Sequence, residues 1–514
     1  MCGRDNDVRS GKLTFTEENT NMDIMYRSTR SNIEVTASQA ILEGLCSDGG
    51  LFVPTAIPAL TEPLADLAQM DYRELAYTVM SKFLTDFTEE ELRACINGAY
   101  DDKFDTKLIA PLKEADGAYY LELFHGSTIA FKDMALSILP YLMTTAAKKN
   151  GTDKKIVILT ATSGDTGKAA MAGFADVPGT EIIVFYPKDG VSEIQKLQMA
   201  TQRGANTHVV AIKGNFDDAQ TAVKNMFHDR ELEQELAAAG FQFSSANSIN
   251  IGRLVPQIAY YVWSYAVLLA QGEIREGDPI NVVVPTGNFG NILAAYYAKR
   301  MGLPVAKLIC ASNENKVLFD FFRTGTYDRN REFILTSSPS MDILISSNLE
   351  RLIYHISGNS AAKTASLMKA LAEKGAYAID EEMKAGLSMF VGGYATEEQT
   401  AEAIRRLYEK EGYVIDPHTA VAAYVYDSFR AQTGSAAPAV IASTASPFKF
   451  ENSVMRALGE PADLPDLELA DRLSEKAGVP VPEAVNVLRT AEVRHNIVCD
   501  REGMKEEVRR FLGM

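Results

Sequence analysis

The chain has 514 residues, of which 46% are hydrophobic and 23% charged, a composition typical of soluble globular proteins with large cores. Its net charge of −17 excludes nucleic acid as the main partner, because binding to a phosphate backbone requires a basic face. An anionic small molecule stays compatible with this charge, since a local site can be basic in an acidic protein. The five cysteines lack metal-ligand spacing, so we expect no metal site and predict a cytoplasmic protein.

The N-terminal residues are polar and charged and lack the apolar run of a signal peptide. We interpret residues 1–21 as a disordered extension and residues 22–105 as a mainly helical domain. Thr88 and Glu91 have the spacing of a capping box, which predicts that a helix opens there.

Short apolar runs alternate with helical patterns in the middle of the chain. This alternation predicts an α/β fold with a parallel sheet, in which glycine-rich turns gather at the carboxyl edge, where ligands bind. The runs are KKIVILTAT (154–162), TEIIVFYP (180–187), THVVAIKG (207–214), INVVVPTGNFGN (280–291), AKLICAS (306–312) and APAVIASTAS (437–446).

The longest uncharged run spans residues 254–272 and approaches the length of a membrane span. Pro256, Gln257 and several tyrosines favour a buried helix instead, and we expect no membrane association.

The first glycine-rich turn is TATSGDTGKAA, residues 160–170. It lacks P-loop spacing, because Thr162 replaces the first glycine and Ala169 the magnesium-binding hydroxyl residue, so an ATP site is disfavoured. Ser163, Thr166 and the glycine amides suit an anion at a helix N-terminus. A tight turn with a capped helix explains the same residues.

Two further turns follow apolar runs. In PTGNFGNILAA, residues 285–295, Leu293 occupies the place of the third glycine of a dinucleotide fingerprint. The remaining loop from Gly287 to Asn291 suits a monophosphate, although asparagine and glycine are common in any turn. In IASTASPFKF, residues 441–450, Ser443 and Thr444 end a predicted strand.

A polar cluster precedes the apolar helix in SSANSINIGRLVPQ, residues 244–257, where Asn247, Ser248, Asn250 and Arg253 lie close together. The guanidinium of Arg253 is suited to a phosphate or carboxylate. The alternative is a helix cap with an arginine paired at the surface.

Lys132 lies in HGSTIAFKDMALSILP, residues 125–140, just before an apolar helical pattern. Taken alone it is a solvated turn lysine. An amine in apolar surroundings, however, can lose its proton near neutral pH and act as a nucleophile. Two anion sites and one such amine, without a metal cluster or a Ser–His–Asp arrangement, indicate pyridoxal phosphate.

These motifs together resemble those of the threonine synthase family of pyridoxal-phosphate enzymes, which has the tryptophan-synthase β-like fold (fold type II). The resemblance covers residues 26 to about 459, in order. Its motifs are YRSTR (26–30), SDGGLFVP (47–54), HGSTIAFKD (125–133), TSGDTG (162–167), NSINIGR (247–253), PTGNFGN (285–291), MDILISSNLERL (341–352), DPHTA (416–420) and STASPFKF (443–450).

The resemblance implies two parallel-sheet lobes around a cofactor cleft, in a core of residues 106–459. A small lobe of about residues 150–260 is inserted in the large lobe, and residues 460–514 form a C-terminal helical segment. Lys132 is implied as the Schiff-base lysine, and Thr444 as the hydroxyl that contacts the pyridine nitrogen. The implied cofactor-binding residues are Lys132, Gly287, Asn288, Phe289, Gly290, Asn291 and Thr444, and the implied substrate-binding residues are Ser163, Thr166, Asn247, Ser248, Asn250 and Arg253.

The implied reaction converts O-phospho-L-homoserine and water into L-threonine and phosphate, by γ-elimination and β-addition of water. A threonine-synthase-like phospholyase, which releases a 2-oxo acid, ammonia and phosphate, uses the same motifs. A non-catalytic binding protein is disfavoured, because Lys132 and the GNFGN loop are both present. We expect a monomer or a weak homodimer.

Two positions depart from the family pattern. Ser127 replaces the proline common after His-Gly, and Ser446 replaces a histidine common in the last motif. The second departure removes an imidazole expected near the cofactor ring.

Overall fold

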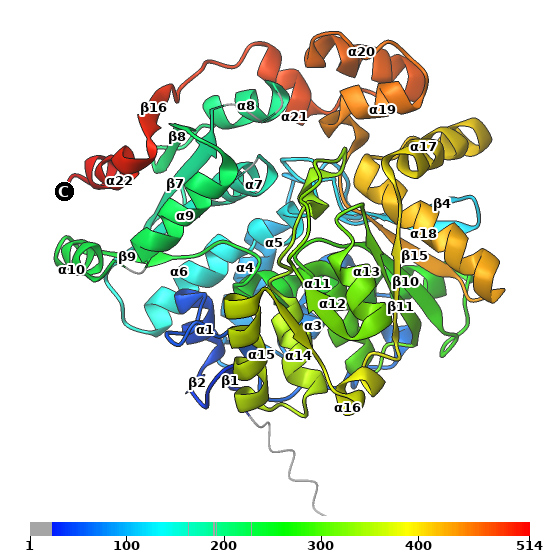
Figure 1. The fold of residues 1–514 in the computed structure, drawn as a ribbon, viewed down its shortest axis with the longest axis horizontal. Helices are drawn as coiled ribbons and strands as arrows, with labels where there is room; N and C mark the ends of the chain where they lie inside the picture. Colours follow the sequence, from blue (N-terminus) through cyan, green and yellow to red (C-terminus); the bar gives the residue numbers. More distant parts are fainter. Residues whose placement is uncertain (1–22, 163, 189–190, 192, 228) are drawn as a thin grey trace, which may run out of the picture.

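The computed structural model describes residues 23–162, 164–188, 191, 193–227 and 229–514, and it has two α/β lobes above an N-terminal part (Figure 1). The predicted α/β fold is confirmed, with both parallel and mixed sheets. The disordered extension predicted for residues 1–21 lies outside the described residues.

The N-terminal part combines a small antiparallel sheet of order β2-β1-β3 with helices. The Thr88 side chain accepts a hydrogen bond from Glu91 N and the Glu91 side chain accepts one from Thr88 N, which confirms the predicted capping box. The elements are β1 (Tyr26–Ser28), β2 (Glu34–Val35), α1 (Ala37–Glu43), β3 (Phe52–Pro54), α2 (Leu64–Leu67), α3 (Tyr72–Met80) and α4 (Glu89–Ala99).

The small lobe is built on a parallel sheet of order β16-β8-β7-β6-β9. The apolar runs predicted as strands between residues 154 and 214 are confirmed as β6, β7 and β8. Two helices precede the lobe, α5 (Asp133–Leu136) and α6 (Leu139–Lys149). Its elements up to β9 are β6 (Lys155–Ala161), α7 (Asp165–Phe174), β7 (Thr180–Pro187), α8 (Glu193–Ala200), β8 (Thr207–Lys213), α9 (Phe216–Phe227), α10 (Arg230–Ala238) and β9 (Phe241–Ser244).

The large lobe has a six-stranded sheet of order β14-β11-β10-β15-β5-β4, in which only β4 and β5 are antiparallel. Its buried strands are the predicted apolar runs. The strands are β4 (Leu112–Ala115), β5 (Ala118–Glu122), β10 (Ile280–Pro285), β11 (Val305–Ser312), β14 (Phe390–Tyr394) and β15 (Ala439–Ser443), with β12 (Thr326–Asp328) and β13 (Ala376–Ala378) as a separate pair. The helices are α11 (Ile251–Gln271), α12 (Gly290–Arg300), α13 (Val317–Thr324), η1 (Pro339–Met341), α14 (Leu349–Ile356), α15 (Ala361–Lys374), α16 (Glu381–Ala385), α17 (Glu397–Glu411), α18 (Pro417–Thr433) and η2 (Pro447–Lys449).

The long apolar helix α11 is buried along most of its length, as predicted, and it begins at a cap made by Asn250. No helix among the described residues is long and apolar enough to cross a membrane.

The C-terminal segment crosses from the large lobe to the small lobe (Figure 1). Leu469 and Leu473 pack into the core of the large lobe, whereas Met504 and Val508 pack into that of the small lobe. The segment predicted as helical also contains one strand, β16, which extends the small-lobe sheet beside β8. The elements are α19 (Glu451–Ala457), α20 (Asp466–Ala477), α21 (Glu483–Asn486), η3 (Val487–Arg489), β16 (Ile497–Asp500), η4 (Arg501–Gly503) and α22 (Met504–Leu512).

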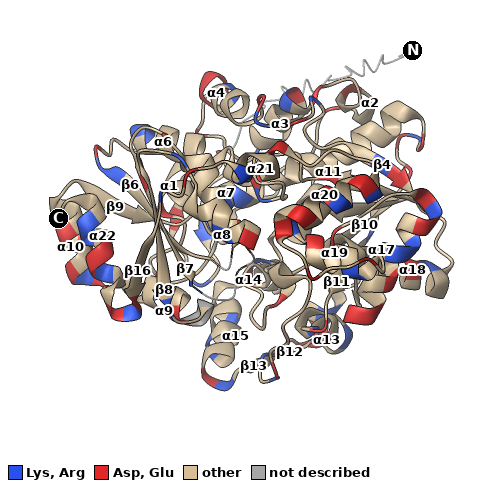
Figure 2. Cartoon of the chain, turned by 90° about the horizontal axis from the view of Figure 1, so that it is seen from above, with Lys and Arg blue, Asp and Glu red and all other residues tan. Residues whose placement is uncertain are grey.

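Ion pairs hold the last helix against the small lobe. In Figure 2 the ribbons of α10 and α22 carry positions of both charge signs. Lys505 lies 2.7 Å from Asp229, and Arg509 donates to Glu235 at 2.8 and 3.0 Å. Both pairs are partly exposed, so each contributes little to the free energy of folding. Their main effect is to fix the orientation of α22 against the small lobe.

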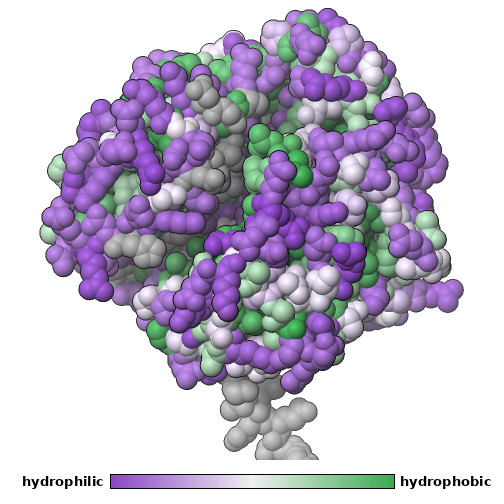
Figure 3. All heavy atoms as spheres, viewed as in Figure 1, coloured by the Kyte–Doolittle hydropathy of each residue, from purple (hydrophilic) through white to green (hydrophobic). Residues whose placement is uncertain are grey.

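A cleft of about 1210 Å³ lies between the lobes and is lined by residues of the small lobe, the large lobe and the N-terminal part. The space-filling view shows the molecule hollowed there (Figure 3). Glycine-rich turns at the carboxyl ends of β6 and β10 face this cleft, as expected for parallel sheets.

Candidate active site

Lys132 is carried by a loop that two sets of hydrogen bonds hold in place. The carboxylate of Asp133, at the start of α5, accepts bonds from Thr128 N at 2.8 Å and Thr128 Oγ1 at 2.6 Å. Phe131 N donates to Thr444 O at 2.8 Å, so the loop is joined to the end of β15. This framework places the Lys132 side chain on the wall of the cleft.

The amine of Lys132 is surrounded by buried polar groups. Its Nζ lies 3.4 Å from Asp165 Oδ2 and 3.2 Å from Ser340 Oγ. Burial lowers the pKa of Lys132, and the positive charges of Lys449 and Arg253 act in the same direction, while the Asp165 carboxylate opposes them. The cleft therefore favours the neutral amine, which is the nucleophilic form.

The loop between β10 and α12 has a conformation that depends on its glycines. A side chain at Gly287 would bring Cβ within 2.5 Å of Ser340 O, so only glycine allows this approach. Phe289 has a φ of 65°, in the left-handed region, immediately before α12 begins. Asn348 N and Nδ2 both donate to Asn288 O at 3.0 Å, which fixes the loop from the outside.

Asn291 lies in the first turn of α12, and only the oxygen of its side-chain amide has hydrogen-bond partners. Its Oδ1 accepts hydrogen bonds from Tyr260, at 2.8 Å, and from Tyr261. Its Nδ2 is buried and has no partner among the described residues. A donor left free beside the N-terminus of a helix suits an anionic oxygen.

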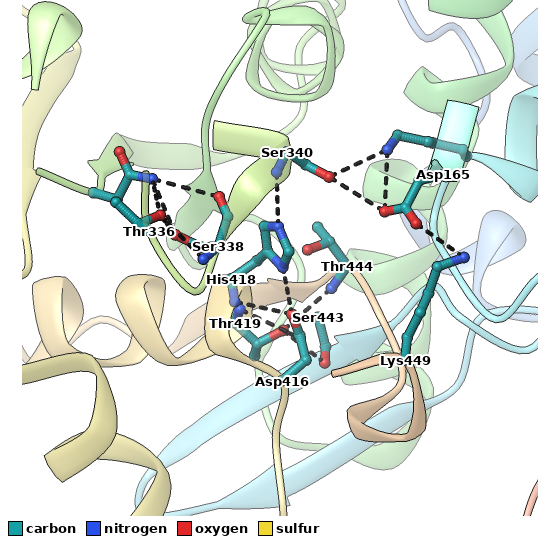
Figure 4. Close-up of polar contacts among 12 residues, drawn as sticks. Asp165, Thr336, Ser338, Ser340, Asp416, His418, Thr419, Ser443, Thr444 and Lys449 are labelled. Carbon is teal, nitrogen blue, oxygen red and sulfur yellow. Dashed lines mark hydrogen bonds and ion pairs between the residues drawn. The ribbon is translucent and has the colours of Figure 1, made fainter. Parts of the chain in front are cut away.

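Thr444 lies on the opposite wall, at the end of β15, and its Oγ1 has no hydrogen-bond partner among the described residues. A network behind it fixes this corner (Figure 4). Thr419 Oγ1 accepts from Thr444 N at 3.3 Å and donates to Asp416. The Thr444 hydroxyl is therefore a free donor on a rigid support.

The predicted substrate-binding residues do not all reach the cleft. Thr166, Asn247, Ser248 and Arg253 line it, whereas Ser163 lies outside the described residues. Asn250 is not among the lining residues. Its side chain accepts from Gly252 N at 2.8 Å and donates to Ile41 O and Ser245 O at 3.0 and 2.9 Å, so it is fully used within the fold.

Arg253 is 3% exposed. It donates to Ala246 O at 3.0 Å, its Nε has no partner, and it forms no ion pair with any residue that the structure describes. Burial lowers the pKa of Arg253 to about 10. A buried, uncompensated guanidinium on a cleft wall favours an anionic ligand.

Four polar residues of the cleft were missed by the sequence interpretation. Asp165 accepts from Gln195 Nε2 at 3.1 Å and from Ser340 Oγ at 3.3 Å. His418 Nε2 accepts from Ser340 N at 3.2 Å, so Nδ1 carries the proton that is donated to Asp416 Oδ1 at 2.8 Å. Asp165 and His418 lie inside quoted motifs, but the sequence alone does not show that they meet Ser340.

Arg351 is fully buried and joins the segments on both sides of Asn348 through its guanidinium. It donates from Nε to Phe52 O at 2.8 Å, from Nη2 to Ile249 O at 2.5 Å, and from Nη1 to Asn348 Oδ1. Asn348 in turn holds Asn288, so one side chain links three separate segments.

We expect Arg351→Met to lower the free energy of unfolding by about 3 kcal/mol or more, because three buried acceptors lose their donor. Urea denaturation of the full chain measures this loss. Arg329→Met is the matched control, since Arg329 is only partly buried and its side chain makes one hydrogen bond, to Ala372 O at 3.2 Å. It should cost less than about 0.5 kcal/mol, and equal losses in both variants would contradict the role of Arg351.

Three family models match the chain in sequence order. The model described as pyridoxal-phosphate dependent enzyme matches residues 108–446, and those described as threonine synthase N terminus and threonine synthase, C-terminal match residues 25–100 and 419–495. Threonine synthase of Pseudomonas aeruginosa is 37% identical over 455 residues, which are 87% of this chain and 93% of that protein. The chain belongs to the threonine synthase family.

Other members agree with this assignment. The crystal structure of threonine synthase from Brucella melitensis with bound pyridoxal phosphate has a TM-score of 0.84 and 34% identity, and the match covers 96% of this chain and all of that one. Human threonine synthase-like 1 is 40% identical over 434 residues, which are 82% of this chain. The chain spans 58% of the length of that relative. Membership places the chain among the pyridoxal-phosphate-dependent enzymes of fold type II.

The cleft of this family member fits pyridoxal phosphate. The free Nδ2 of Asn291 and the N-terminus of α12 suit the phosphate. The free hydroxyl of Thr444 suits the ring nitrogen, and Lys132 supplies the amine. A neutral hydroxyl at the ring nitrogen makes the cofactor a milder electron sink than a carboxylate would.

The two departures from the family pattern lie in different settings. Ser127 is exposed, whereas Ser446 is buried and its Oγ accepts from Phe448 N at 3.3 Å, at the start of η2. An imidazole still lines the cleft, because His418 reaches it from α18. Ser446 therefore serves as a cap.

Proposed function

We propose that this protein is a threonine synthase, which converts O-phospho-L-homoserine and water into L-threonine and phosphate. The observation that carries the proposal is the uncompensated Arg253 in the same cleft as Lys132 and the residues 287–291. The cofactor phosphate is accommodated by α12, so a second anion is needed to balance Arg253. The substrate supplies one in its phosphate or its carboxylate.

The chemistry requires proton transfer at two neighbouring carbons of the substrate. Bound pyridoxal phosphate stabilises negative charge that develops at Cα. The neutral amine of Lys132 is placed to take the proton from Cα and to return one after the phosphate has left. The Ser340 hydroxyl lies 3.2 Å from this amine and orients it. Ser340 is itself held by the hydrogen bond from its backbone N to His418 Nε2.

Departure of the phosphate depends on fixed positive charge. Negative charge builds on the bridging oxygen as the carbon–oxygen bond breaks, and a preorganised donor stabilises it most where water is excluded. Arg253 is buried and already desolvated, so it requires little reorganisation at that moment. Thr166, Asn247 and Ser248 line the same wall and offer further hydrogen bonds.

A phospholyase that releases a 2-oxo acid is the second candidate, because relatives named threonine synthase-like 1 are as similar to this chain as the synthases are. The two activities share the early proton transfers and differ in whether water adds at Cβ. No residue of the cleft separates them.

The experiment that decides between the two activities is turnover of O-phosphohomoserine in ¹⁸O-labelled water. We expect threonine with the label in its hydroxyl group and an equal amount of unlabelled phosphate. Release of 2-oxobutanoate and ammonia would establish the phospholyase instead. Homoserine with labelled phosphate would reveal simple phosphate-ester hydrolysis and would contradict both candidates.

A further inference from the structure

A second lysine lies behind Lys132 and has no place in the chemistry above. Lys449, the last residue of η2, has a side chain with no exposed surface. Its Nζ donates to Thr128 O at 2.9 Å. The same Nζ lies 3.2 Å from Asp165 Oδ1 (Figure 4). It is not among the residues that line the cleft.

Lys449 and Lys132 share one carboxylate. Asp165 faces Lys449 with Oδ1 and Lys132 with Oδ2, at 3.2 and 3.4 Å. Burial raises the pKa of Asp165, but the charges of Lys449 and then Lys132 outweigh it and hold that pKa below its usual range. Asp165 is therefore ionised and can balance only one of the two ammonium groups.

The two lysines differ in their other partners. Lys449 is bound to a backbone carbonyl inside the fold, whereas Lys132 faces the cleft and its second partner is the hydroxyl of Ser340. Two ammonium groups beside one carboxylate leave an excess buried charge, which is costly. The lysine with the weaker partners is the one that gives up its proton.

We propose that Lys449 is a positioning residue, whose ammonium group engages the Asp165 carboxylate and thereby leaves the Lys132 amine neutral in the cleft. The role holds for whichever reaction the cleft performs, because it concerns Lys132 before a substrate binds. The other charged or titratable groups near the pair are Asp133 on α5, Lys168 on α7, Arg253 on α11, His418 on α18 and Glu451 on α19.

The test follows the rate at which the full chain, stripped of cofactor, captures added pyridoxal phosphate at different pH values. The neutral amine of Lys132 is the form that adds to the aldehyde carbon, with loss of one water molecule. The pH midpoint of the capture rate therefore reports the protonation of Lys132, and the visible absorption measures it without substrate.

Charge-changing variants should shift this midpoint in opposite directions. In Lys449→Met it should rise by about one pH unit, because Lys132 becomes the only lysine paired with Asp165 and loses a repelling charge. In Asp165→Asn it should fall by about one unit, because only the repelling charge remains. The double variant restores the original excess charge, so its midpoint should return toward the wild-type value, and Lys449→Arg should leave it unchanged.

A role limited to packing predicts lower thermal stability without these ordered shifts. A folded Lys449→Met protein with the wild-type midpoint would overturn the proposal. If that variant does not fold, Asp165→Asn decides alone, and an unchanged or raised midpoint there overturns it. Because no substrate is used, the outcome is independent of which products are formed from O-phosphohomoserine.

Discussion

Lys132→Ala is expected to lower turnover of O-phosphohomoserine by roughly 10³-fold or more and to yield a colourless protein. The variant removes the amine that holds the cofactor and transfers the protons. It should still fold, because Asp165 keeps Lys449 as its counter-charge at 3.2 Å. Absorption spectra of the purified protein with added pyridoxal phosphate, together with phosphate release, measure both effects.

Lys168→Ala is the matched control for this experiment. Burial lowers the pKa of Lys168 to about 8, so it is a second amine that can be neutral at moderate pH. It does not line the cleft, and its Nζ donates to Gln202 Oε1 at 2.5 Å. This variant should stay yellow. Colour retained in Lys132→Ala, or lost in Lys168→Ala, would show that the wrong lysine has been assigned.

Arg253→Met should lower kcat/KM for O-phosphohomoserine by roughly 10²- to 10³-fold, because a desolvated charge that binds an anion is lost. It should not lower the free energy of unfolding by more than about 1 kcal/mol, since Arg253 makes one hydrogen bond to a backbone carbonyl and no ion pair among the described residues. Steady-state kinetics and urea denaturation of the same preparation separate the two quantities.

Inorganic phosphate provides a second measure of the Arg253 site. It should inhibit the wild-type protein competitively and the variant much more weakly. Arg351→Met offers the contrast, because that arginine binds only groups of the protein and its loss should appear in stability. A large loss of stability in Arg253→Met, with unchanged inhibition by phosphate, would contradict an anion-binding role.

The layout of the sheets was predictable because buried parallel strands have a local signature. Residues 182–187 and 282–285 are uncharged, largely β-branched or aromatic runs, and they form most of β7 and β10. Their turns were predictable as well, since glycines and asparagines mark the carboxyl ends. β16 was missed because residues 497–500 are too short to give this signature. They form a strand only by pairing with β8, which is distant in the sequence.

The cleft was predictable only where one short motif contains the chemistry. The GNFGN loop and Lys132 are of this kind. The partners of Lys132 come from three other segments: Asp165 is 33 residues away, Ser340 is 208 residues away, and Lys449 acts through Asp165. Asn250 shows the opposite error, in which the sequence predicts a binding residue that has a structural role. It lies next to residues that line the cleft, but its side chain caps α11.

The position of β16 has a consequence for how the chain folds during synthesis. The small-lobe sheet needs residues 497–500 beside residues 210–213, so this edge stays open until residues 497–500 have been made. An unpaired edge strand is a template for pairing with other chains. Closing so long a loop is also slow, because its entropy is lost before the new contacts form. The nascent small lobe is therefore the part of this protein that most needs protection from aggregation.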